Sequence, residues 1–334
     1  MTKSQQIIYK LLIQEPGKIW TTEELVEVLS IDRTNVYRNM ENLSRMNKVE
    51  RIAKGKYRVY IDPIMYVQIP FFFLTPVSYN PDFLRSYIPN VSSFLWEFRE
   101  KIGEATRNIE PMATLDYMKN RRAIENLLID LSYTSSKMEG NTYSYLDPEV
   151  LIKYNEEAEW KKQEETQMIL NHKVAIEYII DGKNMFHLTK SEFCELHALL
   201  GKWLIHDTYL GIFRTTPVQI GGSRYLPPDI PSLIEWEFSL FLEKLRQIEN
   251  PLEQSLFILI FIPYFQAFID INKRTSRLSA NIPLIAHGLP PISLLQIKER
   301  AYIDAILAIY ELNDVSLMAK LYTENYLLNM HRYM

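Results

Sequence analysis

Two apolar stretches frame a short polar segment in the last third of the chain, and this arrangement most constrains the fold. The run 256–265 (LFILIFIPYF) leads into the segment, and 276–286 leads out of it. Their apolar patterns predict buried helices on both sides. The segment between them, 265–278, holds two amides, one carboxylate and three cations. Polar side chains between buried helices cost free energy unless they are paired or bind something. The segment is therefore a binding site or an ion-paired helix junction.

The residue types in this segment favour a phosphate ligand. In a loop that begins a helix, backbone N–H groups and the positive end of the helix dipole point at any ligand bound there, which suits an anion. Lys273, Arg274 and Arg277 add positive charge, and guanidinium groups match phosphate well. Asp270 is then a candidate ligand for the Mg2+ that accompanies a polyphosphate. From the residues alone, the phosphate site and the ion-paired junction both stay open.

The composition predicts a mainly helical protein of two domains. The chain has only 10 glycines, which favours helices. Its 334 residues are enough for two domains. A single cysteine, Cys194, excludes an internal disulfide framework and a cysteine-based zinc site. The N-terminus lacks a signal-peptide core, and the apolar runs are too short to span a bilayer. We therefore expect a cytoplasmic protein with no membrane partner.

Residues 1–61 predict a small winged helix-turn-helix domain. They carry 11 Lys or Arg against 7 Asp or Glu, a net charge of +4, whereas the remainder (26 against 34) carries −8. Three amphipathic helical segments are followed by strand-like segments at 49–52 and 57–61, the winged-helix order. If this domain binds double-stranded DNA, the third helix enters the major groove and the wing meets phosphates. The groove residues are then Arg33, Thr34, Asn35, Tyr37 and Arg38, and the wing residues are Lys54, Lys56 and Arg58. The alternative is a protein-contact module.

The segment 62–110 is rich in proline and aromatic residues, and we expect it to connect the two predicted domains. Its apolar run 69–74 is too hydrophobic for a free linker, so we expect it to pack on one of the two domains. The same run could cover a surface used by a second copy of the chain. A homodimer is the expected assembly only because two-fold dimers are the commonest soluble oligomers.

The body of the chain, 111–334, is helical with one predicted hairpin. A helical pattern over 121–133 ends near Glu139 and Gly140, where glycine suits the position beyond a helix C-terminus. A carboxylate there is disfavoured by the helix dipole, so it needs a cation or solvent. Two strand-like pieces within 218–228 surround Gly221, Gly222 and Ser223, which predicts a β-hairpin. The edge of such a hairpin can pair with an extended target peptide.

Three features in this body resemble the Fic family. The stretch 266–277 is similar to the pattern His-x-Phe-x-(Asp/Glu)-x-Asn-(Gly/Lys)-Arg-x-x-Arg. It reads Gln266-Ala-Phe268-Ile-Asp270-Ile-Asn272-Lys273-Arg274-Thr-Ser-Arg277. The family's inhibitory motif, (Ser/Thr)-x-x-x-Glu-(Gly/Asn), is similar to Ser135, Glu139 and Gly140. The hairpin resembles the flap that clamps a target, through Gly221, Gly222, Ser223 and Tyr225. A winged helix joined to a Fic domain is a familiar arrangement.

The resemblance implies an all-helical core with a single hairpin flap and an inhibitory helix over about 121–140. It also implies transfer of AMP from ATP, or another nucleoside triphosphate, to a Ser, Thr or Tyr hydroxyl of a protein target. Asp270 would hold Mg2+, and Phe268 would be an apolar anchor. The phosphates would contact the loop N–H groups and Asn272, Lys273, Arg274 and Arg277. Glu139 would pair with Arg277 and displace the terminal phosphate.

Two departures from the family pattern bear on activity. The position of the catalytic His holds Gln266, and a glutamine amide cannot act as general base, which should reduce transfer by about 10²–10⁴-fold. The glycine that often follows Asn272 is Lys273, a form shared with the Doc toxins, which phosphorylate their targets.

The sequence therefore leaves the function open between two main classes. The first is a nucleotidyltransferase with weakened or altered activity, with Doc-like phosphotransfer as the narrower option. The second is a nucleotide-responsive regulator that binds DNA or protein and has a catalytically degenerate Fic pocket. A protein scaffold without nucleotide affinity is a third possibility.

Overall fold

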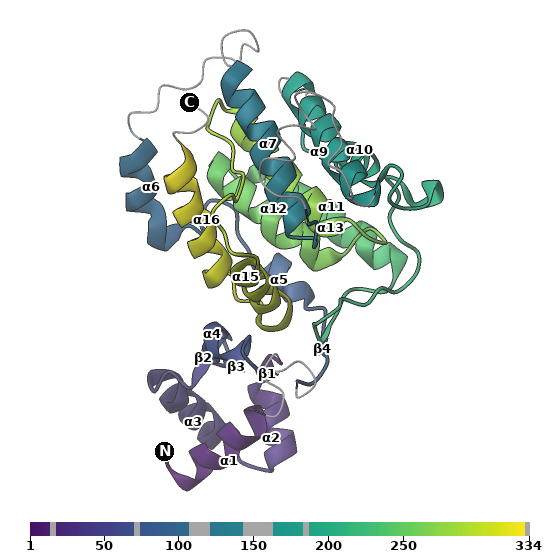
Figure 1. The fold of residues 1–334 in the computed structure, drawn as a ribbon. Helices are drawn as coiled ribbons and strands as arrows, with labels where there is room; N and C mark the ends of the chain where they lie inside the picture. Colours follow the sequence, from purple (N-terminus) through teal and green to yellow (C-terminus); the bar gives the residue numbers. More distant parts are fainter. Residues whose placement is uncertain (14–17, 70–73, 107–120, 143–162, 183–186, 331–334) are drawn as a thin grey trace. The chain divides into compact units, whose positions relative to one another are not determined.

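The computed structural model of the protein describes residues 1–13, 18–69, 74–106, 121–142, 163–182 and 187–330. Helices dominate these residues and the strands are short, as the predicted mainly α class requires (Figure 1). The chain divides into two compact units. Unit 1 comprises Met1–Ser78, Ile220–Leu226 and Leu307–Asp314, and unit 2 comprises Tyr79–Gln219, Pro227–Ile306 and Val315–Met334.

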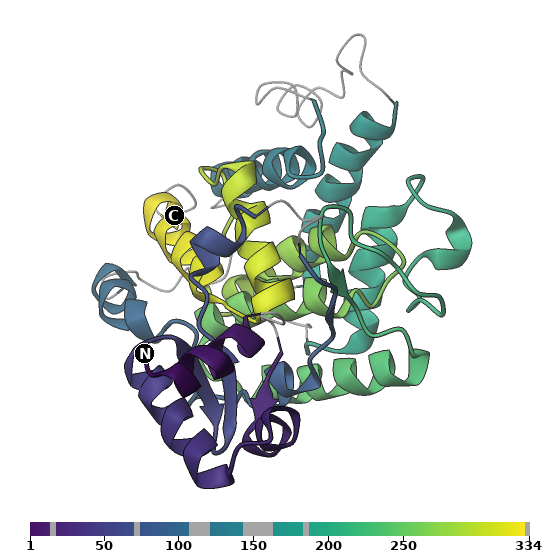
Figure 2. The same cartoon turned by 90° about the horizontal axis from the view of Figure 1, so that it is seen from below.

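The N-terminal part of unit 1 contains three helices and a three-stranded sheet (Figure 2). The helices are α1 (Lys3–Leu12), α2 (Thr22–Leu29) and α3 (Arg33–Arg45), and the strands are β1 (Trp20–Thr21), β2 (Val49–Ala53) and β3 (Lys56–Val59). The strands pair antiparallel in the order β1-β3-β2. Thr21 and Glu24 form a capping box at the start of α2.

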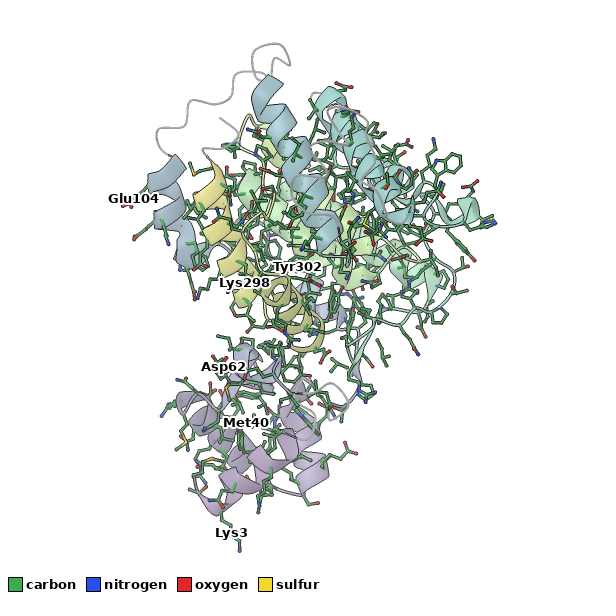
Figure 3. All side chains as sticks on the ribbon, in the orientation of Figure 1. Lys3, Met40, Asp62, Glu104, Lys298 and Tyr302 are labelled. Carbon is green, nitrogen blue, oxygen red and sulfur yellow. The ribbon has the colours of Figure 1, made fainter. Side chains whose placement is uncertain are left out.

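One apolar core joins these helices to the sheet. Ile8, Leu25, Val36, Met40 and Tyr57 are completely buried in it, and Figure 3 labels Met40 on α3. Each helix contributes residues three or four positions apart, so their apolar faces turn inward. The opposite, polar face of α3 is left exposed.

The predicted hairpin at 218–228 is wrong. The chain does turn there, since the Ser223 N–H donates to the Ile220 carbonyl at 3.2 Å. The strand after the turn, β5 (Tyr225–Leu226), pairs parallel with β4 (Val77–Ser78) instead of with 218–220. The Val77 N–H donates to the Arg224 carbonyl at 2.9 Å. The partner of β5 therefore comes from the end of the Met1–Ser78 stretch of unit 1.

A buried carboxylate at Glu311 fixes this part of unit 1. Glu311 lies near the end of α15 (Glu299–Leu312) and is 2% exposed. Its Oε2 accepts from the Tyr66 hydroxyl at 2.8 Å, and its Oε1 accepts from the Ser223 hydroxyl at 2.6 Å and the Arg224 N–H at 3.0 Å. Tyr66 ends the short helix α4 (Pro63–Tyr66). One side chain thus connects α4, α15 and the 220–226 segment.

The prediction that Arg58 contacts DNA phosphates is also wrong. Arg58 is only 9% exposed and lies on β3. Its guanidinium donates to the Leu312 carbonyl and pairs with Glu50 at 2.7 Å. A cation at the last carbonyl of α15 is favoured by the helix dipole, so Arg58 is a structural residue.

Unit 2 is a bundle of helices around α12 (Pro251–Phe265). Every residue of α12 from Leu252 to Phe265 is buried, which confirms the buried helix predicted at 256–265. The predicted run 276–286 forms two helices, α13 (Asn272–Ser279) and α14 (Asn281–Ala286). The other helices are α5 (Pro81–Arg85), η2 (Trp96–Phe98), α6 (Arg99–Thr106), α7 (Arg121–Lys137), α9 (Gln163–Gly182), α10 (Lys190–Gly201), η3 (Asp207–Tyr209), α11 (Pro231–Gln247) and α16 (Ser316–Asn329).

The later part of the connecting segment packs on α12. Phe83 packs against Phe261 and Tyr87 against Phe257, with tilted rings whose centroids are 5.0 and 4.8 Å apart. The Tyr87 hydroxyl also donates to the buried carboxylate of Glu253 at 3.0 Å. Most of the apolar run 69–74 lies outside the described residues, so its predicted packing stays a prediction.

Substituting Glu311 by Ala tests its role in unit 1. The change leaves the Tyr66 hydroxyl, the Ser223 hydroxyl and the Arg224 N–H without their acceptor, which should cost on the order of 3 kcal/mol. We expect faster hydrogen exchange at the amides of 223–226 and a lower melting temperature. Glu324→Ala removes an exposed carboxylate and should leave both unchanged. Unaltered exchange at 223–226 in Glu311→Ala would show that the carboxylate does not hold this segment.

Candidate functional site

The loop between α12 and α13 has an unusual backbone held by one amide. Gln266 and Ile271 have φ values of +47° and +65°, which are uncommon for residues other than glycine. Asn272, the first residue of α13, ties the loop together. Its Oδ1 accepts from the Phe268 N–H and its Nδ2 donates to the Phe268 carbonyl, both at 2.9 Å. Packing and hydrogen bonds thus maintain a backbone that the residues alone would not adopt.

Phe268 anchors the loop to α10. Its ring stacks on His197 with centroids 3.9 Å apart and planes 9° from parallel. His197 Nε2 donates to the Asp270 carbonyl at 3.2 Å, and Nδ1 accepts from the Gly211 N–H at 3.0 Å. These partners need a neutral imidazole, and burial lowers the pKa of His197 to about 4. His197 is thus a buried core histidine that also supports the loop.

Gln266 lies at the end of α12 with both ends of its amide engaged. Nε2 donates to the Pro263 carbonyl at 2.9 Å, and Oε1 accepts from Asn272 Nδ2 at 3.1 Å. The Gln266 carbonyl accepts from Arg214 Nε at 2.5 Å, and the Arg214 N–H donates to the Ala267 carbonyl at 2.9 Å. Arg214 is 4% exposed. Sequence reasoning assigned it no role, because a lone arginine before a loop carries no distinctive signal.

Arg277 is buried, and its partners come from the last turn of α7, from Glu139 just beyond it and from α15. It is 1% exposed. Its Nη2 contacts Glu139 Oε1 at 2.7 Å and the Ser135 carbonyl at 3.0 Å, and its Nε donates to Ser135 Oγ at 3.0 Å. Nη1 lies 3.4 Å from the Tyr302 hydroxyl on α15, a residue labelled in Figure 3. The structure therefore brings Ser135, Glu139 and Arg277 together.

Glu139 lies between two cations of α13. Besides Arg277, Lys273 Nζ is 3.4 Å from Glu139 Oε2. Burial opposes ionisation of Glu139, but the charges of Arg277, Lys273 and Arg274 outweigh it and hold its pKa below the ordinary value. Gly140 follows with a φ of +86°, so it has the left-handed backbone predicted beyond the helix end.

Arg274 is the least satisfied cation of the site. It is 6% exposed, and its Nε and Nη1 atoms are buried with no hydrogen-bond partner among the described residues. Its Nη2 lies 3.9 Å from the Asp270 carboxylate. Burial lowers the pKa of Arg274, although Glu139 and Asp270 oppose this. Buried donors of this kind favour an anionic ligand with several acceptor oxygens, such as a phosphate.

Asp270 is suitably placed for a cation that accompanies such an anion. Its side chain is 66% exposed, and Oδ1 accepts from the Ile271 N–H at 2.6 Å. A solvent-accessible carboxylate of this kind fits Mg2+, which binds proteins through one or two carboxylates and substrate phosphates. The donor set around α13 therefore fits a nucleotide phosphate with Mg2+.

His172 on α9 is a further residue to which the sequence assigned no role. Its Nδ1 donates to the Met168 carbonyl at 2.7 Å, so its Nε2 accepts from the Ser135 hydroxyl at 2.8 Å. Ser135 Oγ in turn accepts from Arg277 Nε. Burial lowers the pKa of His172 to about 3. A single histidine in a helical pattern gives no signal of this role, because its partners lie elsewhere in the sequence.

The remaining predicted site residues lie in unit 1. Gly221, Gly222, Ser223 and Tyr225 belong to the segment held by Glu311, and Tyr225 stacks on Tyr310 at 5.1 Å. Arg33, Thr34, Tyr37 and Arg38 are exposed on α3, and Asn35 and Lys56 are half-buried. Arg33 pairs with Glu23 at 2.6 Å, and Arg38 donates to Asn35 Oδ1 at 2.8 Å. Lys54 is exposed between β2 and β3.

The low pKa of His172 predicts acid sensitivity. The unfolded chain takes up this proton below about pH 6.5 and the folded one only near pH 3, so folding stability falls as pH falls through that window. Between pH 6.5 and 5 this histidine alone should cost about 2 kcal/mol, at 1.36 kcal/mol per pH unit.

Denaturant unfolding at both pH values, with His172→Gln beside the native chain, measures this effect. Glutamine keeps an acceptor for Ser135 but cannot titrate, so the variant should lose about 2 kcal/mol less over this interval. His206→Gln changes an exposed histidine and serves as the control. Equal losses in native chain and His172→Gln would contradict a neutral, buried His172.

Comparisons with known proteins show what part of this chain is similar to. The model of the Fic/DOC family matches residues 187–284. The protein adenylyltransferase Fic of Aedes aegypti is 28% identical over 194 residues, covering 56% of this chain and 38% of that protein. That of Nematostella vectensis is 26% identical over 212 residues, covering 61% of this chain and 48% of that protein. The chain thus spans less than half the length of these relatives.

Solved structures share the fold. A Fic domain containing signaling protein from Bacteroides thetaiotaomicron has a TM-score of 0.55 at 18% identity, covering 70% of this chain and 93% of that one. A Fic family protein from Desulfovibrio desulfuricans G20 has a TM-score of 0.58 at 17% identity, covering 73% and 76%. Within the described residues, no helix is both long and apolar enough to cross a membrane. The chain contains a domain of the Fic/DOC family.

Proposed function

We propose that the protein binds a nucleoside triphosphate, ATP in the first instance, at the loop and helix start formed by 266–277. The observation that carries the proposal is Arg274, whose Nε and Nη1 are buried without a partner among the residues that the structure describes, beside a second buried arginine, Arg277. Arg277 is held by Glu139 at 2.7 Å. The phosphates would supply acceptors to Arg274, and the terminal phosphate would take the position of the Glu139 carboxylate at Arg277.

Each residue of the loop then has a definite part. Loop N–H groups and Asn272 orient the phosphates, while Lys273, Arg274 and Arg277 balance their charge. Asp270 would hold Mg2+, which neutralises phosphate charge when it is bound. Glu139 opposes nucleotide binding, because its carboxylate and the terminal phosphate compete for the guanidinium of Arg277.

The activity that follows is Fic-type transfer of AMP to a hydroxyl of a protein target, weakened or altered at Gln266. The adenylyltransferase relatives support this reaction at the level of the family domain. The amide of Gln266 can orient a hydroxyl through hydrogen bonds, but it cannot accept its proton. Lys273, shared with the Doc toxins, makes phosphoryl transfer the narrower alternative. The mass added to the target distinguishes the two reactions.

Calorimetric titration of ATP·Mg2+ tests the proposal. Glu139→Gly removes the competitor of the terminal phosphate, so we expect affinity to rise at least tenfold, equivalent to about 1.4 kcal/mol. Glu195→Gln, which neutralises an exposed carboxylate on α10, should bind as the native chain does. Adding Gln266→His to Glu139→Gly supplies a general base, so labelling of protein by ATP should rise about 10²–10⁴-fold.

The outcomes separate binding from catalysis. Failure of Glu139→Gly to bind ATP, GTP or another nucleoside triphosphate would refute the nucleotide pocket. Binding without labelling in the Gln266→His variant would refute transfer and leave nucleotide binding as the function of the domain.

A second candidate function is a nucleotide-responsive regulator that uses the N-terminal domain to bind double-stranded DNA. The observation in its favour is the exposed face of α3, which presents Thr34, Tyr37 and Arg38 beyond a complete apolar core. Recognition helices of winged helix-turn-helix domains use such a face in the major groove. A protein partner on the same face is the alternative result.

Arg38→Ala tests the DNA proposal on a mixed-sequence duplex. If Arg38 contacts a phosphate, the variant should bind DNA several-fold more weakly. The slope of log affinity against log salt concentration should also decrease by about one, the share of one phosphate contact. Arg246→Ala removes an exposed arginine of unit 2 and is the matched control. Salt-insensitive binding, or equal binding by both variants, would exclude DNA as the partner of α3.

A further inference from the structure

Lys273 occupies a position that its charge alone would disfavour. It is the second residue of α13, where the positive end of the helix dipole repels a cation. Glu139 lies just beyond the end of α7, where the dipole disfavours a carboxylate. Their contact, with Lys273 Nζ 3.4 Å from Glu139 Oε2, relieves both conflicts.

The Glu139 carboxylate is therefore divided between two cations. Oε1 faces Arg277 at 2.7 Å, and Oε2 faces Lys273 at 3.4 Å. Arg277 is almost completely buried, whereas the Lys273 side chain is 39% exposed. Arg277 alone would fix one oxygen and leave the carboxylate free to rotate about that contact. The second cation fixes both oxygens.

We propose that Lys273 is a positioning residue that holds Glu139 in the place of the terminal phosphate, in addition to any contact it makes with a bound nucleotide. The inference rests on the proposed nucleotide pocket. It assigns Lys273 two opposite effects. While Glu139 contacts Arg277, Lys273 stabilises Glu139, which is the competitor of the nucleotide. Once a nucleotide has displaced Glu139, Lys273 is one more cation for the phosphates.

The charges of the pocket support this dual role. Lys273, Arg274 and Arg277 face two carboxylates, Glu139 and Asp270, which leaves one positive charge in excess. Without Glu139 the excess is two, and Lys273 and Arg277 both lose an acceptor. A nucleotide phosphate then finds two released cations on successive turns of α13.

A sign reversal distinguishes this role from a purely structural one. With Glu139 present, Lys273→Met weakens the hold on the Glu139 carboxylate, so Glu139 competes less well with the phosphate. ATP·Mg2+ should therefore bind this variant about three- to tenfold more tightly than it binds the native chain. In the Glu139→Gly background the same change only removes a cation from the phosphates, so binding should weaken by a similar factor. A residue that merely maintains the fold would weaken binding in both backgrounds.

The experiment is a calorimetric cycle with ATP·Mg2+ on the native chain, Lys273→Met, Glu139→Gly and the double variant. Lys273→Arg, which keeps the charge, should bind within about twofold of the native chain. Lys320→Met, at an exposed lysine of α16, controls for loss of a surface charge. Circular dichroism confirms that each variant is folded.

Three results would overturn the inference. They are unchanged or weaker binding in Lys273→Met, the same direction of effect in both backgrounds, and Lys273→Arg behaving as Lys273→Met. If Glu139→Gly binds ATP tightly while one of these results is obtained, the inference fails and the proposed function stands. If Glu139→Gly binds no nucleotide, both fail together.

Discussion

The buried guanidinium of Arg277 is the group on which the site depends. A charge in the interior must be paired and hydrogen-bonded, because its desolvation is otherwise very costly. Arg277 meets this requirement with Glu139, both oxygens of Ser135, and Tyr302. These partners come from the end of α7 and from α15, so the ion pair ties both to α13. Any ligand that displaces Glu139 must offer Arg277 an equally good acceptor.

The loop before α13 is organised for the same purpose. Asn272 closes it, Phe268 stacks it on His197, and Arg214 holds its first carbonyl. These contacts keep Gln266 and Ile271 in a left-handed backbone and leave Arg274 with unpaired donors. A rigid loop with unpaired donors suits binding, since little reorganisation is needed when phosphate oxygens arrive.

Much of this organisation was predictable from the sequence, but for different reasons. The continuous apolar run of α12 is a local signal, and it correctly predicts a buried helix. The capping box at Thr21 and Glu24 is equally local. The meeting of Glu139 with Arg277, 138 residues apart, followed only from the resemblance to the Fic family, because no local pattern specifies it.

The errors and omissions share one physical origin, namely partners that are distant in the chain. β5 has the local pattern of a hairpin arm, but its partner is β4 at the end of the Met1–Ser78 stretch. Arg58 has the pattern of an exposed wing residue, yet it turns to the end of α15. His172 and Tyr302 are single residues on ordinary helices, and their contact with Ser135 or Arg277 gives them their place in the site.

The central claim is that Glu139 and a nucleotide phosphate compete for the guanidinium of Arg277. Side-chain ¹⁵N–¹H spectra of arginine-labelled native protein test it directly, since the Nε–H resonances of Arg274 and Arg277 can be followed during titration with ATP·Mg2+. Both resonances should move together, with Arg277 losing the shift caused by its contact with Glu139 and Arg274 gaining one from the phosphate oxygens. ATP binding that leaves both resonances in place would contradict the claim.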